Sequence, residues 1–208
     1  MSEINPSDIE AILFDMDGTL VDSDGAVERA WLTWSEEYGV DGAAAIRLAH
    51  GSPSESTVRK LLPHLDGDAV RAASARQLEL QYDDLADVVA TPGAHELLAL
   101  LAELSLPWAV VTSADARLAK ARLDAAGIEP AVLVTTDDIA TGKPDPAGYR
   151  LAAELLHVPT GACLVVEDAE VGLEAARAAG AYTAALRGLT GDLTLTGLPA
   201  LTEFLRRR

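Results

Sequence analysis

The chain carries two carboxylates one residue apart, directly after an apolar run. The stretch AILFDMDGTL (11–20) leads an expected buried strand to Asp15, and Asp17 follows after one residue. Two carboxylates this close repel each other, and burying either one without a partner is costly. The pair therefore predicts a positive partner at the end of this strand.

A second acidic pair, Glu167 and Asp168, follows the apolar run CLVV (163–166). Because parallel strands bring their carboxyl ends together, we expect both acidic pairs to meet. Hard oxygen ligands without histidine or cysteine beside them suit Mg²⁺ better than zinc. The predicted metal ligands are Asp15, Asp17, Glu167 and Asp168. For Glu167, direct ligation and support of the other ligands both remain open.

Three further residues have the chemistry of a phosphate site. Thr112 and Ser113 follow an apolar run and offer a hydroxyl and backbone N–H groups, and Lys143 offers a compact positive charge. An alternative for Ser113 is capping of the helix that follows. Lys143 does not belong to a Walker motif, which would need glycine in place of Asp137 and Ser or Thr in place of Pro144.

The apolar runs that end at these residues predict a parallel sheet. Expected strands cover residues 9–14, 108–111, 131–134, 162–166 and 182–186. They are nearly continuous in hydrophobicity, which is typical of parallel strands covered on both faces. Amphipathic helices at 94–104 and 116–126 lie between strands. The sequence therefore predicts an α/β, doubly wound (Rossmann-like) parallel sheet with its site at the carboxyl ends of the strands.

A long segment between the first two expected strands interrupts this alternation. Residues 23–89 show helical patterns at 26–38, 43–49, 54–62 and 68–85. This is too much chain for one crossover helix, so we expect a helical cap domain inserted after the first strand. The predicted domains are a core of residues 1–22 and 90–208 and a cap of residues 23–89, with hinges at 22–25 and 90–93.

Composition limits the partners of the chain. Its 208 residues carry a formal charge of −17, which opposes binding to nucleic acid and to anionic membranes. The positive field for an anionic substrate must then be local. Cys163 is the one cysteine, which favours a reducing compartment. With no signal sequence and no apolar run of about 18 residues, we expect a cytoplasmic protein, a monomer or weak homodimer.

Four motifs together resemble a known family. The stretches DMDGTLVDS (15–23), VVTS (110–113), GKP (142–144) and VVEDA (165–169) occur in this order and resemble the motifs of the haloacid dehalogenase superfamily. The insert resembles the cap of the subfamily that carries it after the first motif. Local phrases such as LVDSDGAVERAW (20–31) resemble sugar and polyol phosphatases of the 2-deoxyglucose-6-phosphatase and glycerol-phosphatase type.

The resemblance implies a mechanism. Asp15 would attack phosphorus and form an aspartyl-phosphate, and Asp17 would protonate the leaving oxygen and then activate water. The cofactor would be Mg²⁺, held by Asp15, Asp168 and the backbone carbonyl of Asp17. The groups that stabilise the transferred phosphoryl group would be Thr112, the Ser113 amide and Lys143.

The substrate implied by the resemblance is a small phosphorylated metabolite. Candidate contacts in the cap are Glu28, His50 and Arg59. For each of them an exposed or helix-capping position is an equally good or better interpretation. Residues 22–24 are expected to cap the first cap helix instead of binding substrate.

Three other functions remain open. The first is a phosphosugar mutase of the β-phosphoglucomutase type, which uses a cap histidine at the place where this chain has Val27. The second is a dehalogenase, which would not need the acid/base Asp17. The third is a non-catalytic binding protein, although every motif residue is present.

Overall fold

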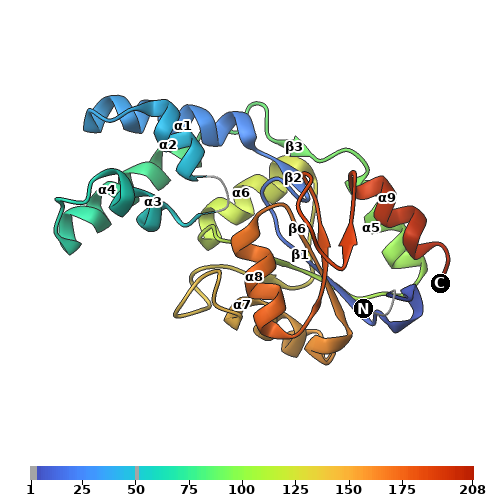
Figure 1. The fold of residues 1–208 in the computed structure, drawn as a ribbon. Coiled ribbons are helices and arrows are strands. Elements are labelled where there is room, and N and C mark those ends of the chain that lie inside the picture. Colours follow the sequence, from blue (N-terminus) through green and yellow to red (C-terminus); the bar gives the residue numbers. More distant parts are fainter. Residues whose placement is uncertain (1–3, 50–51) are drawn as a thin grey trace.

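A six-stranded parallel sheet runs through the computed structural model, which describes residues 4–49 and 52–208 (Figure 1). In spatial order its strands are β5 (Leu133–Val134), β4 (Trp108–Val111), β1 (Ala11–Phe14), β6 (Cys163–Glu167), β7 (Tyr182–Ala185) and β8 (Leu193–Thr194). All neighbours in this order are parallel. The predicted α/β class is confirmed.

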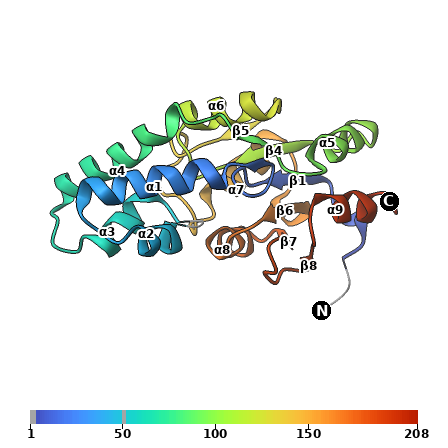
Figure 2. The same ribbon diagram turned by 90° about the horizontal axis from the view of Figure 1, so that it is seen from above.

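Alternation along β1 divides the core into two layers. Ile12 and Phe14 pack on one face of the sheet, whereas Ala11 and Leu13 pack on the other. The first face is covered by α5 (Ala94–Glu103), α6 (Ala116–Ala126) and α9 (Leu198–Leu205), and the second by α7 (Ala147–Leu155) and α8 (Glu170–Ala179). Figure 2 shows α5 and α8 on opposite sides of the sheet. Apolar burial on both faces explains the continuous hydrophobicity of the strands.

Strand ends differ slightly from the prediction. A short 3-10 helix (Pro6–Asp8) delays the start of β1 to Ala11, because the Ile9 backbone N–H bonds back to the Pro6 carbonyl. Strand β6 extends through Glu167, so this carboxylate belongs to the strand itself. Strand β8 was not predicted, since it lies at the sheet edge and has only two residues, of which Leu193 is partly buried and Thr194 is exposed.

The inserted segment forms a separate group of four helices (Figure 1). They are α1 (Asp24–Tyr38), α2 (Gly42–Ala49), α3 (Ser54–Leu61) and α4 (Gly67–Tyr82). Their apolar faces share a cluster of their own around Trp31 and Trp34, and the Trp34 indole donates to the Ala73 carbonyl at 2.8 Å. A core of its own supports the division into cap and core domains, which stays a prediction. No described helix combines the length and apolar character needed to cross a bilayer.

The two connections between this cap and the sheet are paired with each other. Strand β2 (Val21–Asp22) runs antiparallel to β3 (Val89–Ala90), and the Thr91 backbone N–H donates to the Leu20 carbonyl at 2.9 Å. Two-residue strands leave almost no periodic signal, so this ribbon was not predicted. It places both expected hinges beside the carboxyl end of β1.

Candidate active site

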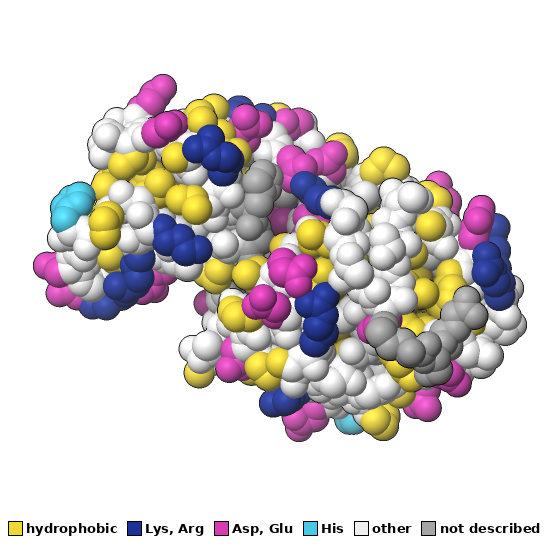
Figure 3. Space-filling view, viewed as in Figure 1, with side chains coloured by type: hydrophobic (Ala, Val, Ile, Leu, Met, Phe, Trp, Pro, Cys, Tyr) yellow, Lys and Arg dark blue, Asp and Glu magenta, His cyan; other side chains and the backbone are white. Residues whose placement is uncertain are grey.

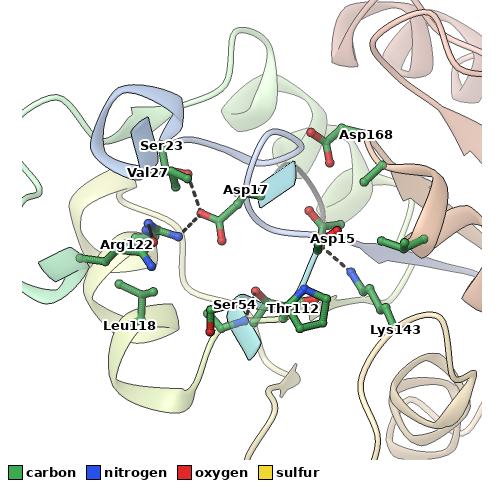
Figure 4. Close-up of a pocket in the computed structure, with 18 of the residues that line it drawn as sticks. Asp15, Asp17, Ser23, Val27, Ser54, Thr112, Leu118, Arg122, Lys143 and Asp168 are labelled. Carbon is green, nitrogen blue, oxygen red and sulfur yellow. Dashed lines mark hydrogen bonds and ion pairs between the residues drawn. The ribbon is translucent and has the colours of Figure 1, made fainter. Parts of the chain in front are cut away.

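A cavity of about 150 Å³ lies between the cap helices and the carboxyl edge of the sheet. Its core wall includes Asp15, Asp17, Thr112, Lys143 and Asp168, which the sequence placed in one site. Figure 4 shows side chains from separate segments pointing into this space. The fold therefore brings together residues that are up to 153 positions apart in the chain, counted from Asp15 to Asp168.

Lys143 is the cation at the centre of the buried acids. Its Nζ donates to Asp15 Oδ1 at 2.5 Å, to Glu167 Oε1 at 2.7 Å and to the Val111 carbonyl oxygen at 3.0 Å. All three ammonium protons thus have acceptors. Burial disfavours the charged amine, but Asp15 and Glu167 outweigh it and raise the pKa of Lys143 above its ordinary value. The sequence predicted a divalent cation as the positive partner at this strand end and Lys143 as a phosphate ligand; in the structure Lys143, from a distant loop, also contacts Asp15 directly.

Glu167 is held by donors on both of its carboxylate oxygens. Besides Lys143, the Tyr149 hydroxyl donates to Oε1 at 2.7 Å, and the backbone amides of Asp168 and Ala169 donate to Oε2 at 3.1 and 3.2 Å. A Cβ on Gly172 would lie 1.7 Å from Oε1, so α8 can approach this closely only with glycine there. These contacts favour a role for Glu167 in supporting the other ligands, over direct ligation of the metal by Glu167.

Asp168 is more open and has a different partner. Arg187 Nε lies 3.0 Å from Asp168 Oδ2, and the same guanidinium pairs with Asp24 at the start of α1. Gly18 adopts a left-handed φ of +81°, and a Cβ there would lie 2.1 Å from Asp168 Oδ2. Glycine in the first motif therefore leaves the space that this carboxylate occupies.

The acidic cluster fits a divalent cation. One oxygen of each of Asp15, Glu167 and Asp168 lies within 4.8 Å of the others, and the cations that contact these three carboxylates are Lys143 and, at Asp168, Arg187. Burial raises the pKa of Asp15 despite Lys143, and burial together with Glu167 raises the pKa of Asp168 to about 7. The uncompensated negative charge and the all-oxygen donor set suit a hard metal ion.

Asp17 has its own pair of donors. The Ser23 hydroxyl donates to Asp17 Oδ1 at 2.6 Å, and Arg122 Nη1 lies 2.8 Å from the same oxygen. Figure 4 shows both contacts as dashed lines. Ser23 does occupy the N-cap position of α1, but its side chain makes no capping bond, so the expectation that it caps this helix through its side chain is wrong.

The predicted phosphate ligands line the cavity. Thr112 is buried, and its Oγ1 accepts the Ala114 amide at 3.1 Å, which leaves the hydroxyl proton available. Ser113 also faces the cavity. Asp115, not Ser113, caps α6 by accepting the Leu118 amide at 2.8 Å. The capping alternative for Ser113 is therefore wrong.

Of the three cap residues proposed for substrate binding, neither Glu28 nor Arg59 lines the cavity. Glu28 is exposed at the mouth, in a side pocket with Asp24 and Arg187. Arg59 is exposed on α3 and pairs with Glu55 one helical turn away at 2.6 Å. His50 lies outside the described residues.

Residues that the prediction missed form the cap wall and its link to the core. Gln77 and Gln81 of α4 line the cavity, as does Arg122 of α6. The sequence carried a signal for Arg122, because it falls on the apolar stripe of the helix at 116–126, where a charge needs a buried partner. Tyr149, the donor to Glu167, lies on an apolar helix face and gave no such signal.

The fold and the cavity define an α/β protein with an acidic pocket between its parallel sheet and a group of inserted helices. The chain belongs to the haloacid dehalogenase-like hydrolase family, whose model matches residues 9–180. This confirms the family that the four motifs resembled.

Individual relatives agree with this assignment. The chain is 36% identical over 178 residues to hexitol phosphatase A of Escherichia coli, covering 85% of this chain and 82% of that protein. It is 36% identical over 190 residues to 2-deoxyglucose-6-phosphate phosphatase 1 of Saccharomyces cerevisiae, covering 82% and 77%. The crystal structure of a hydrolase from Pseudomonas syringae superimposes with a TM-score of 0.84 at 25% identity and covers 96% and 98% of the two chains.

Proposed function

We propose that the protein is a Mg²⁺-dependent phosphatase that hydrolyses a small sugar or polyol phosphate through an aspartyl-phosphate. The observation that carries the proposal is the convergence of Asp15, Lys143 and Asp168 in one cavity beneath the cap. The relatives named above are phosphatases, which supports hydrolysis of a phosphoric monoester over the mutase reaction.

Asp15 is the proposed nucleophile. Its carboxylate bonds to phosphorus while the bond from phosphorus to the ester oxygen breaks, which divides the hydrolysis into two easier steps. Lys143 holds one carboxylate oxygen at 2.5 Å and orients the group. Thr112, the Ser113 amide and Lys143 stabilise the charge on the transferred group.

Asp17 is the proposed general acid and base. It gives a proton to the departing sugar oxygen and then accepts one from the water that cleaves the aspartyl-phosphate. Ser23 and Arg122 both hold Oδ1. This anchoring fixes the position of the carboxyl group beside the cavity and leaves Oδ2 for proton transfer.

Asp15, Asp168 and the backbone carbonyl of Asp17 are the proposed ligands of the metal, supported by Glu167. When bound, Mg²⁺ would reduce the repulsion between an anionic nucleophile and an anionic phosphate. The acidic side chains of the cavity repel phosphate. The metal and Lys143 together therefore supply the positive charge that attracts it.

Asp15→Asn tests the nucleophile, with p-nitrophenyl phosphate as substrate in the presence of Mg²⁺ or of EDTA. We expect metal-dependent turnover in the unchanged protein and a loss of at least about a thousandfold in the variant. Asp8→Asn, an exposed acid on the 3-10 helix, is the matched control and should retain full activity. Substantial activity in Asp15→Asn would reject the assignment.

Asp17→Asn tests the covalent intermediate. An asparagine cannot accept a proton from water, whereas p-nitrophenolate leaves without protonation, so the phosphorylated enzyme should accumulate. Mass spectrometry of acid-quenched samples should locate the added phosphoryl group on the peptide that contains Asp15. A phosphoryl group on another peptide would contradict the mechanism.

The place of action completes the proposal. The acidic composition and single cysteine support a cytoplasmic enzyme, acting as a monomer or weak homodimer. In the view of Figure 3, lysine and arginine side chains are interspersed with acids over both lobes. This distribution supports a small metabolite as the partner, not a polyanion.

A further inference from the structure

We propose that Gln77 is a specificity-determining residue that donates its amide N–H to a neutral hydroxyl oxygen of the substrate's leaving group. This inference rests on the proposed phosphatase function and deepens it, because it assigns the chemical class of the leaving group. A series of buried, hydrogen-bonded polar side chains that crosses from the core to the cap carries this assignment.

The series contains three side chains beyond Asp17, each hydrogen-bonded to the next. Arg122 of α6 contacts Asp17 Oδ1 through Nη1 and donates from Nη2 to Gln81 Oε1 at 2.6 Å. Gln81 Nε2 then donates to Gln77 Oε1 at 2.8 Å, one turn away on α4. Arg122, Gln81 and Gln77 are 2%, 7% and 1% exposed, so water does not compete freely for these bonds.

Arg122 fixes which atoms donate and which accept along this series of hydrogen bonds. A guanidinium has five donors and no acceptor, so the Gln81 atom facing it must be the amide oxygen. The amide nitrogen of Gln81 then faces Gln77, and Gln77 must answer with its own oxygen. The amide nitrogen of Gln77 is therefore the last donor in the series. The orientation of both amide groups follows from which atoms can donate and which can accept.

That terminal nitrogen is buried without a partner. Among residues 4–49 and 52–208, no acceptor lies within hydrogen-bond distance of Gln77 Nε2. An unsatisfied buried donor is costly, so its retention on the wall of an active-site cavity points to a ligand acceptor. Gln77 lines the same cavity as Asp15 and Asp17.

The charge of the cavity selects the kind of acceptor. Its walls carry five acids against the two cations Lys143 and Arg122; the acids are Asp15, Asp17, Asp24, Glu167 and Asp168. Arg187 beside the cavity pairs with Asp24 and Asp168. A divalent ion would balance the remaining charge, but the phosphate of the substrate is itself an anion, so a further carboxylate on the leaving group would meet net negative charge. A hydroxyl oxygen accepts from Gln77 without this repulsion. Trp31, Leu78 and Leu118 offer apolar surface to a carbon chain between the two ends.

Gln77→Met tests the donor while it keeps the length of the side chain. We expect kcat/KM for a hexitol 6-phosphate to fall by about three- to tenfold, the range for one net hydrogen bond, chiefly through KM. For p-nitrophenyl phosphate, whose aryl group offers no hydroxyl, kcat/KM should change less than about twofold. Glu79→Gln, at an exposed position of the same helix and outside the cavity, is the matched control and should leave the ratio of the two substrates unchanged.

Gln77→Glu is the second variant, because its carboxylate still accepts from Gln81 but offers no donor and adds a buried negative charge. It should reduce turnover of the hexitol phosphate at least as much as Gln77→Met. In Gln77→Met, an equal loss on both substrates, or no loss on the hexitol phosphate, would overturn the role of Gln77 alone. Preference of the unchanged enzyme for 2-phosphoglycolate over the hexitol phosphate would overturn the neutral leaving group. Absence of metal-dependent turnover with every ester would instead overturn the proposed function.

Discussion

At the scale of single residues, the site depends on compensation between buried charges. Lys143 contacts two carboxylates and a carbonyl, while Tyr149 and two backbone amides complete the shell of Glu167. A buried pair contributes little net stability, but removal of one partner leaves an uncompensated charge. The same contacts that orient Asp15, the proposed nucleophile, therefore also keep the folded state intact.

Lys143→Met should lower the free energy of unfolding by about 3–5 kcal/mol in the absence of metal, because Asp15 and Glu167 lose their cation. Urea unfolding in EDTA measures this change. Lys120→Met is the matched control, since Lys120 pairs with Asp124 on an exposed helix face and such pairs contribute less than about 1 kcal/mol. Equal effects of the two substitutions would show that Lys143 does not carry this compensation.

At the scale of elements, close approach between helices and strands sets the geometry of the site. Helix α8 begins three residues beyond the end of β6 and passes directly over the Glu167 carboxylate. The neighbouring loop is equally tight where Gly18 passes Asp168. Glycine is needed at both contacts because any side chain there would collide with a carboxylate, which the sequence motifs alone do not explain.

Gly172→Ala should displace the Glu167 carboxylate, because the new Cβ would lie 1.7 Å from Oε1. We expect a loss of at least about tenfold in kcat and about 1–3 kcal/mol of stability. Gly142→Ala is the control, since its Cβ would meet no described atom within 4 Å and its backbone needs no left-handed φ. Assays of both variants with p-nitrophenyl phosphate and thermal unfolding decide the question.

Strand β6 also contains Cys163, and the reactivity of its thiol measures how completely it is buried. Cys163 is fully buried, and burial raises the pKa of its thiol from an ordinary 9.0 to about 11. The thiol is therefore neutral at pH 8, and labelling by Ellman's reagent should be slow in the folded protein and rapid in urea. Because the folded pKa is raised, this group's contribution to stability is lost as pH rises from about 9 toward 11. Rapid labelling of the folded protein would contradict the burial.

At the scale of the whole molecule, two lobes enclose one strongly acidic cavity. The cap has its own core around its tryptophans, and the β2–β3 ribbon ties its two connections together beside β1. Arg122, Gln81 and Gln77 link core and cap across the cavity. Anything that binds the acidic cluster of the folded state should therefore stabilise the entire chain.

Mg²⁺ should raise the midpoint of thermal unfolding when it is added at constant ionic strength. At a hundred times its Kd, a ligand of the folded state alone contributes about 2.7 kcal/mol. For a chain of this size the shift should be about 5 °C or more. Asp168→Asn should lose most of the shift, whereas NaCl of matched ionic strength should not reproduce it in either protein. An equal Mg²⁺ effect in both proteins would place the metal elsewhere.

Local patterns were sufficient to predict the family, the parallel sheet and the convergence of the motif residues on one cavity. A run of apolar residues ending on Asp15 or Asp168 is a short-range signal, and parallel strands leave little choice about which ends meet. The helical insert was predictable because its length and periodicity did not fit a single crossover helix. Cap residues such as Arg59 were poor predictions, because helical periodicity alone does not tell which face meets the cavity.

The sequence by itself therefore determined which chemistry the strand ends could carry: acids for a metal, hydroxyls and a lysine for a phosphate. Only the tertiary structure decided which partners hold those groups. Tyr149 on Glu167, Ser23 and Arg122 on Asp17, and the glutamines of α4 act through contacts between distant segments. The physical reason is that a hydrogen bond depends on distances of about 3 Å, which only the packing of segments distant in the sequence can fix.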